Sequence, residues 1–167
     1  MKRFLVLLGT SLFGLALTGC ASDPRGDAVN NVVGLMEGAA GDIGTITKEV
    51  DKALKKHKDE SAAFDLNDAI KATKKLEERG REVQKAKTEQ VDRLKPATDD
   101  EKVELATRFK SRLNNAFANL VKEKTELNKA LTKAEDLGAD AKEKVEDLRA
   151  KIREAEGPFD ALNRQQG

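Results

Sequence analysis

The side chains best suited to chemistry are scarce in this chain, which has one cysteine, Cys20, and one histidine, His57. A di-metal site in a helical bundle uses Glu-x-x-His pairs, but Leu54 stands three residues before His57. The sequence also lacks a nucleophile elbow, a phosphate-binding glycine loop and the zinc motif His-Glu-x-x-His. Because lysines surround His57, we expect it to be a solvated residue at a helix end. We therefore predict no catalytic residue, no bound metal and no cofactor, and hence no enzyme.

The densest acidic patch is Asp99-Asp100-Glu101, which raises the question of a calcium site. Calcium requires six to eight oxygen ligands around a tight loop. Here Thr98 precedes the acids and Glu101 follows it by three positions, which is the capping-box pattern of a helix start. Acidic residues are also favoured at the positive end of the helix dipole. The patch therefore predicts a helix N-terminus and not a metal site.

The residues before Cys20 have the three parts of a secretory signal. Lys2 and Arg3 precede an apolar run, and small residues follow it. The run is shorter than the roughly 20 residues that span a bilayer. The tetrad Leu17-Thr18-Gly19-Cys20 resembles the lipobox of bacterial lipoproteins. That resemblance implies that residues 1–19 are a cleaved signal peptide, and that Cys20 carries a diacylglycerol and an acylated amino terminus, with fatty acids such as palmitate.

The same resemblance implies a location. In Gram-negative lipoproteins an aspartate directly after the cysteine retains the protein at the inner membrane, whereas this chain has Ala21 there. The expected location is therefore the outer membrane, facing the periplasm. Because Cys20 is used for lipidation, no disulfide is available and the fold must rest on packing alone.

The composition of the remaining chain limits the classes of ligand. Residues 20–167 are enough for one domain with a core, and carry 29 basic and 30 acidic residues. This balance gives no basic face for nucleic acid, and interspersed charges favour pairs on helix surfaces. Trp and Tyr are absent, which argues against stacking platforms and aromatic cages.

Apolar residues recur every three or four positions, a coiled-coil-like period that predicts an all-α helical bundle over residues 27–167. Residues 20–26, with Pro24 and Gly26, are expected to be a lipidated tether. Helices are predicted over 27–57 and 65–95, with Pro96 ending the second. A third begins after Thr98, and a last one ends at Gly157-Pro158.

Two architectures remain open because the three-four rhythm continues through Gly138. If Gly138 is the left-handed residue after a helix, the chain is an antiparallel bundle of three long helices plus a shorter fourth. If not, it is a three-helix coiled-coil bundle with one continuous helix over 99–156. That helix would be about 87 Å long, far longer than its neighbours, so we favour the turn.

Four glycines in the first helix are expected on the face away from the core: Gly34, Gly38, Gly41 and Gly44. Each costs about 1 kcal/mol relative to alanine inside a helix. Either residues 21–44 form a loosely helical stalk, or the glycines form a strip that another helix approaches closely.

The leading functional hypothesis is a lipid-anchored envelope protein without catalytic activity, which acts as a helical interaction or scaffold module. Its expected partners are the membrane, through Cys20, and an envelope protein or a second copy. The alternative is an envelope carrier that holds an apolar ligand or an acyl chain in the bundle, for which the support is the weak apolar pattern near Gly80.

Overall fold

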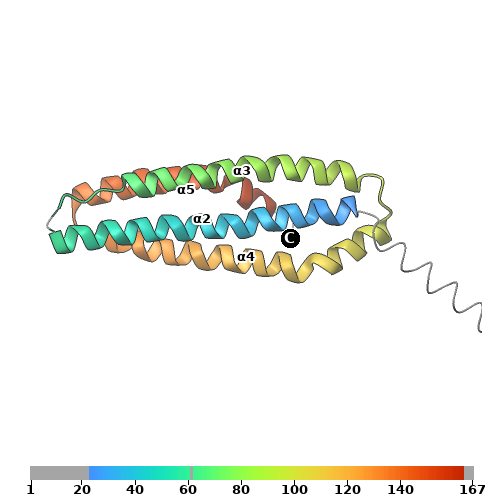
Figure 1. Ribbon diagram of the computed structural model, residues 1–167, viewed down its shortest axis with the longest axis horizontal. Helices are drawn as coiled ribbons and strands as arrows, with labels where there is room; N and C mark the ends of the chain where they lie inside the picture. The colour runs from blue at the N-terminus through green and yellow to red at the C-terminus, as the bar shows by residue number, and fades with distance from the viewer. Residues whose placement is uncertain (1–22, 61, 164–167) are drawn as a thin grey trace, which may run out of the picture.

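The computed structural model describes residues 23–60 and 62–163, which form an antiparallel bundle of four helices. These are α2 (Pro24–Glu60), α3 (Asn67–Leu94), α4 (Asp99–Glu135) and α5 (Ala139–Asn163), and no strand occurs among the residues described. Figure 1 shows α2 lying between α3 and α4, with α5 running alongside α3. The predicted all-α bundle is confirmed. Among the described helices, none combines the length and hydropathy that crossing a bilayer requires.

Helix α2 begins earlier than the sequence analysis expected. Asp23 caps it, since its carboxylate accepts a hydrogen bond from the backbone N–H of Gly26 at 3.0 Å. Pro24 occupies the first helical position, where its fixed φ suits the helix and no N–H is needed. Residues 24–26, expected in the tether, are therefore already helical. The hypothesis of a loose stalk over residues 21–44 is wrong, because apolar residues from Ala28 to Ile43 are buried in the bundle.

Helix α4 has the predicted ends. The Thr98 hydroxyl accepts from the Glu101 N–H at 3.3 Å, and the Glu101 carboxylate accepts from the Thr98 N–H at 2.8 Å. At the other end the chain turns at Gly138, which has a φ of +123°. The alternative of one continuous helix over 99–156 is therefore wrong. The turn lets α5 fold back, and the four-helix architecture follows.

Helix α5 differs from the prediction that Gly157-Pro158 ends it. It continues through Pro158 to Asn163, although proline removes a backbone hydrogen bond from a helix interior. Phe159, with only 1% of its surface exposed, gives a reason, because burial of its ring holds the last turns against the bundle. It belongs to one continuous core that contains residues from all four helices.

The glycines of α2 divide into two kinds. Gly34 and Gly41 face open space, as predicted. Gly38 and Gly44 lie next to long side chains of this chain, Arg79 of α3 and Glu123 of α4. The hypothesis that all four glycines form a strip open to another helix is therefore wrong.

Candidate functional site

Of the single cysteine and the single histidine, only His57 lies among the residues that the structure describes. Cys20 lies outside the described residues, so its lipidation stays a prediction. His57 is half-buried near the end of α2, where its Nδ1 lies 2.6 Å from the carbonyl oxygen of Ala62 and its ring meets Phe64 edge-on, with 6.1 Å between centroids. A carbonyl only accepts, so Nδ1 carries the proton. His57 fastens the loop between α2 and α3, a structural task that its sequence context did not predict.

The acidic patch at the start of α4 is occupied by structural contacts. Besides its bonds to Thr98, Glu101 pairs with Arg25 of α2 at 3.0 Å. The backbone bond from Thr98, with help from Arg25, lowers the pKa of Glu101 below its ordinary value of 4.5. In the part of the chain that the structure describes, no group of His, Cys, Asp and Glu side chains could hold a metal ion.

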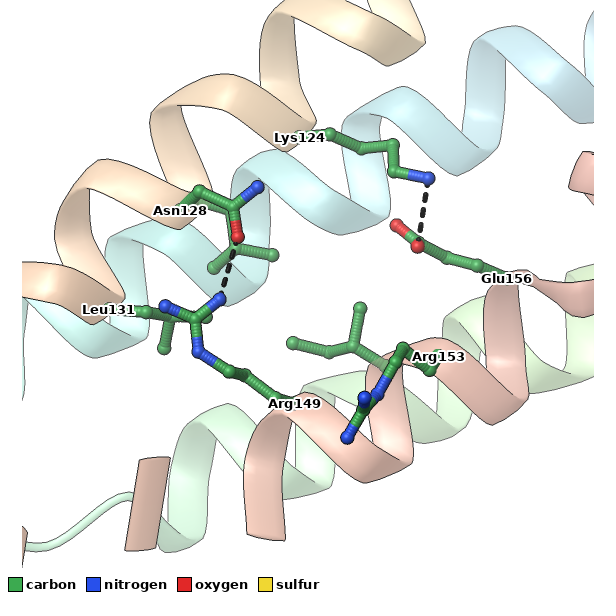
Figure 2. Close-up of a pocket in the computed structure, with 8 residues that line it drawn as sticks. Lys124, Asn128, Leu131, Arg149, Arg153 and Glu156 are labelled. Atoms are coloured by element: carbon green, nitrogen blue, oxygen red, sulfur yellow. Dashed lines mark hydrogen bonds and ion pairs between the residues drawn. The ribbon is translucent and has the colours of Figure 1, made fainter. Parts of the chain in front are cut away.

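The most distinctive hollow of the bundle lies between α4 and α5. These two helices approach each other at far fewer positions than the other neighbouring pairs do. A pocket of about 230 Å³ opens between them, and Figure 2 shows its lining. Its floor is apolar, formed by Leu127 and Leu131 of α4 and Ile152 of α5, each at least 94% buried.

Two polar bridges cross this groove, as Figure 2 shows. Arg149 donates to the Asn128 side-chain oxygen at 2.8 Å and to the Glu135 carboxylate at 3.1 Å. Two turns further along α5, Glu156 pairs with Lys124 of α4 at 2.9 Å. Long polar side chains thus join the two helices above the apolar floor, at a place where the backbones stand apart.

The groove continues along α4 past the second bridge. An adjoining hollow of about 180 Å³ shares Lys124 and Asn128 with the first and reaches Phe117, Val121 and Phe159. From Phe117 to Leu131 the groove follows α4 for about 21 Å, at ~1.5 Å per residue. The two hollows together form a long slot with an apolar floor, which we call the α4–α5 groove.

Three cationic side chains line the pocket between the bridges: Lys124, Arg149 and Arg153. Lys124 is paired with Glu156 and Arg149 with Glu135, whereas Arg153 is exposed. Glu156 is also the one charged residue that is buried in the described part of the chain, with 7% of its surface exposed. Burial of a charge requires a partner, and Lys124 provides it. The groove therefore combines an apolar floor with a cationic rim.

The apolar pattern did not predict this groove and indicated loose packing elsewhere. Its expectation of a weakly packed second helix around Gly80 is wrong, since Gly80 is buried and a β-carbon there would lie 3.0 Å from the carbonyl oxygen of Ala155. A signal for the groove did exist. Glu156 follows Ile152 by four positions, so it occupies the apolar phase of α5, where a carboxylate is unusual.

A further, larger hollow of about 700 Å³ lies at the end of the bundle near the α2–α3 loop. Lys144 of α5 crosses it and donates to the backbone carbonyl of Phe64 at 2.6 Å. Its lining includes the carboxylates of Asp65, Asp140, Glu143 and Asp147. Several of these acids stand at helix starts, where capping and the helix dipole account for them.

The fold and the groove define the protein as an antiparallel four-helix bundle with a lateral groove. In comparisons with protein-family models, curated proteins and solved structures, none matches the chain. Its function must therefore be argued from its own residues.

Proposed function

We propose that the protein is a non-enzymatic interaction or scaffold module of the bacterial cell envelope, anchored by lipid on Cys20 at the periplasmic side of the outer membrane. The observation that carries the proposal is the short distance in sequence between the lipobox cysteine and the first turn of α2. Only Ala21 and Ser22 separate Cys20 from Asp23, the cap of that helix. A lipid on Cys20 would thus hold the bundle close to the membrane, with almost no tether between them.

Contacts with α3 and α4 hold the start of α2 in place. A lipid anchor next to this helix would therefore hold the whole bundle. Arg93 of α3 donates to the carbonyl oxygen of Pro24 at 3.0 Å, and Arg108 of α4 pairs with Asp23. The 37 residues of α2 extend about 55 Å at ~1.5 Å per residue. The far end of the bundle, with the α2–α3 loop, would then present a surface for an envelope partner about 55 Å from the anchor.

The absence of an enzymatic role is part of the proposal. His57 is engaged in closing a loop, and the acids at the start of α4 are engaged in capping. A base or a nucleophile must reach a reacting group in a cleft, and neither set of side chains is free to do so.

The experiment that tests the anchor is metabolic labelling with a fatty acid, followed by fractionation of the envelope. The full chain should be labelled and should stay with the membrane, while Cys20→Ser should lose both label and attachment. Asp23→Asn serves as the control, because it changes the helix cap but leaves the cysteine. A wild-type protein in the membrane fraction without label would show that the lipobox is not used.

The carrier is the second candidate, and the α4–α5 groove is the observation that favours it. Ligand sites in bundles lie between helices and combine an apolar lining with a few polar groups. The α4–α5 groove has both.

A further inference from the structure

We propose that the α4–α5 groove binds a single-chain amphiphile with an anionic head group, such as a fatty acid. The floor would hold the hydrocarbon chain and the cationic rim would hold the head. This inference deepens the carrier candidate and rests on it, and it does not depend on the lipid anchor.

The floor of the groove fits one alkyl chain. Leu127, Leu131 and Ile152 line the first hollow, and the second continues to Phe117 and Phe159. An apolar chain laid along this floor would lose contact with water at about 25 cal/mol per Å² of buried apolar area. A slot about 21 Å long and open along one side suits a linear molecule.

The rim fits an anion. Arg153 is exposed on α5, and no hydrogen bond or ion pair engages it within residues 23–60 and 62–163. Arg149 lies one turn before it, held in place by Asn128 and Glu135. The guanidinium of Arg153 presents forked donors that match a carboxylate or a phosphate, and Arg149 adds positive charge one turn away. Lys124 lies on the other wall, paired with Glu156, and the head group would lie between the two bridges.

The size of the groove excludes a helix as its occupant. The two hollows measure about 230 and 180 Å³. A helix with its side chains has a diameter of about 10–12 Å, so seating one between α4 and α5 would require breaking both polar bridges. A small ligand occupies a site of a few hundred Å³ and leaves the bridges in place.

The test uses residues 21–167, which omit the cysteine and hence any covalent lipid. Every member of the apolar core lies between Val29 and Phe159, so this part contains the complete bundle. Calorimetric titration with dodecanoate below its micelle concentration should show one saturable site. Dodecyltrimethylammonium has the same chain and the opposite charge, and it should bind at least tenfold more weakly.

Two pairs of variants locate the site. Arg153→Gln should weaken dodecanoate binding about tenfold, the order expected when a hydrogen bond to a charged group is lost. Arg81→Gln removes another exposed arginine, from α3, and should leave the affinity unchanged. Val121→Glu places a carboxylate on the wall of the groove and should weaken binding at least tenfold. Val103→Glu changes a similarly exposed valine of α4, 65% against 59%, and should have no effect.

Three results would overturn the proposal. They are equal affinity for the two amphiphiles, equal effects of Val121→Glu and Val103→Glu, and unchanged dodecanoate binding in Arg153→Gln. Failure here is distinguishable from failure of the anchor, because fatty-acid labelling of Cys20 is measured on a different residue. A labelled chain whose groove binds nothing would leave the scaffold proposal standing and refute the carrier.

Discussion

Gly80 of α3 lies against the ring of Phe159 in α5, so closely that a β-carbon on Gly80 would stand 3.6 Å from Cε2 of that ring. The same β-carbon would meet the carbonyl oxygen of Ala155 at 3.0 Å, and a backbone atom cannot rotate aside. We expect Gly80→Ala to lower the melting temperature, because the strain of moving α5 exceeds the gain in helix propensity. Thermal unfolding followed by circular dichroism measures it.

The matched controls are Gly34→Ala and Gly41→Ala, in which the new β-carbon meets nothing within 4 Å. Each should stabilise the bundle by up to about 1 kcal/mol, since alanine favours the helix more than glycine does. If all three substitutions raised the melting temperature alike, the close approach of α3 and α5 at Gly80 would be refuted.

Gly138→Ala tests the turn that separates α4 from α5. Gly138 has a φ of +123°, a conformation that residues with a β-carbon rarely adopt. We expect destabilisation of about 1 kcal/mol or more by chemical denaturation. Stabilisation would indicate instead that α4 and α5 form one continuous helix in solution.

Local signals in the sequence predicted this part of the fold well. The capping box at Thr98 and the turn at Gly138 are each formed by residues that lie within four positions of one another in the sequence. Each of them can therefore be recognised from the sequence. The same local logic applied to Asp23-Pro24, yet Gly26 favoured a tether. The prediction that Pro158 ends α5 was wrong for another reason. Burial of Phe159 outweighs the loss of the backbone hydrogen bond that proline removes.

The groove was less predictable because it depends on how far apart two helices lie. Periodicity shows that Leu127 and Ile152 face inward, but not whether they touch each other. That separation follows from the cross-helix pairs Lys124–Glu156 and Arg149–Asn128, which join residues 32 and 21 positions apart. Only the charge of Glu156 at an apolar position offered a hint.

The contacts of Asp23 and Glu101 at the start of α2 predict that the stability of the bundle depends on pH. The hydrogen bond from Arg108, followed by that from the Gly26 backbone, holds the pKa of Asp23 below its ordinary value of 3.8, and the pKa of Glu101 is lowered as well. A lowered pKa in the folded state contributes stability above the unfolded-state pKa and loses it as pH falls through the folded value. We expect the melting temperature to fall as the pH drops from about 5 to below 3.8.

The variants Asp23→Asn and Glu101→Gln should flatten this part of the pH profile, because neither side chain then titrates. Asp59→Asn changes an exposed residue at the far end of α2 and serves as the control. A profile that stays equally steep in the double variant would mean that other carboxylates cause the acid sensitivity.

Leu148 and Leu113 differ in burial, because α5 covers only part of the length of α4. Leu148 of α5 has no exposed surface, whereas Leu113 of α4 is only half-buried. Leu148→Asp should cost at least about 3 kcal/mol, since it removes a packed side chain and buries a charge. Leu113→Asp should cost clearly less, because its carboxylate can turn to water. Equal losses in urea unfolding would contradict the burial of these positions.

The last prediction concerns Gly38 of α2, which makes room for the side chain of Arg79. A β-carbon on Gly38 would collide with the Arg79 guanidinium, whose Nε donates to the Asp42 carboxylate at 2.6 Å. Asp42 is largely buried, with 13% of its side chain exposed, so the pair is partly shielded from water. Gly38→Ala therefore brings two opposing effects, a gain in helix propensity and a weakened ion pair.

A double-mutant cycle separates the two effects. In the wild-type background Gly38→Ala should change the unfolding free energy little, because the cost of displacing the Arg79 guanidinium offsets the gain in helix propensity. In the Arg79→Ala background the collision is absent, and the same substitution should stabilise by about 1 kcal/mol. The coupling energy should thus be about 0.5–1 kcal/mol, and Gly41→Ala, with no neighbour to displace, should show none. Zero coupling for Gly38 would mean that Arg79 reaches Asp42 without crossing this glycine.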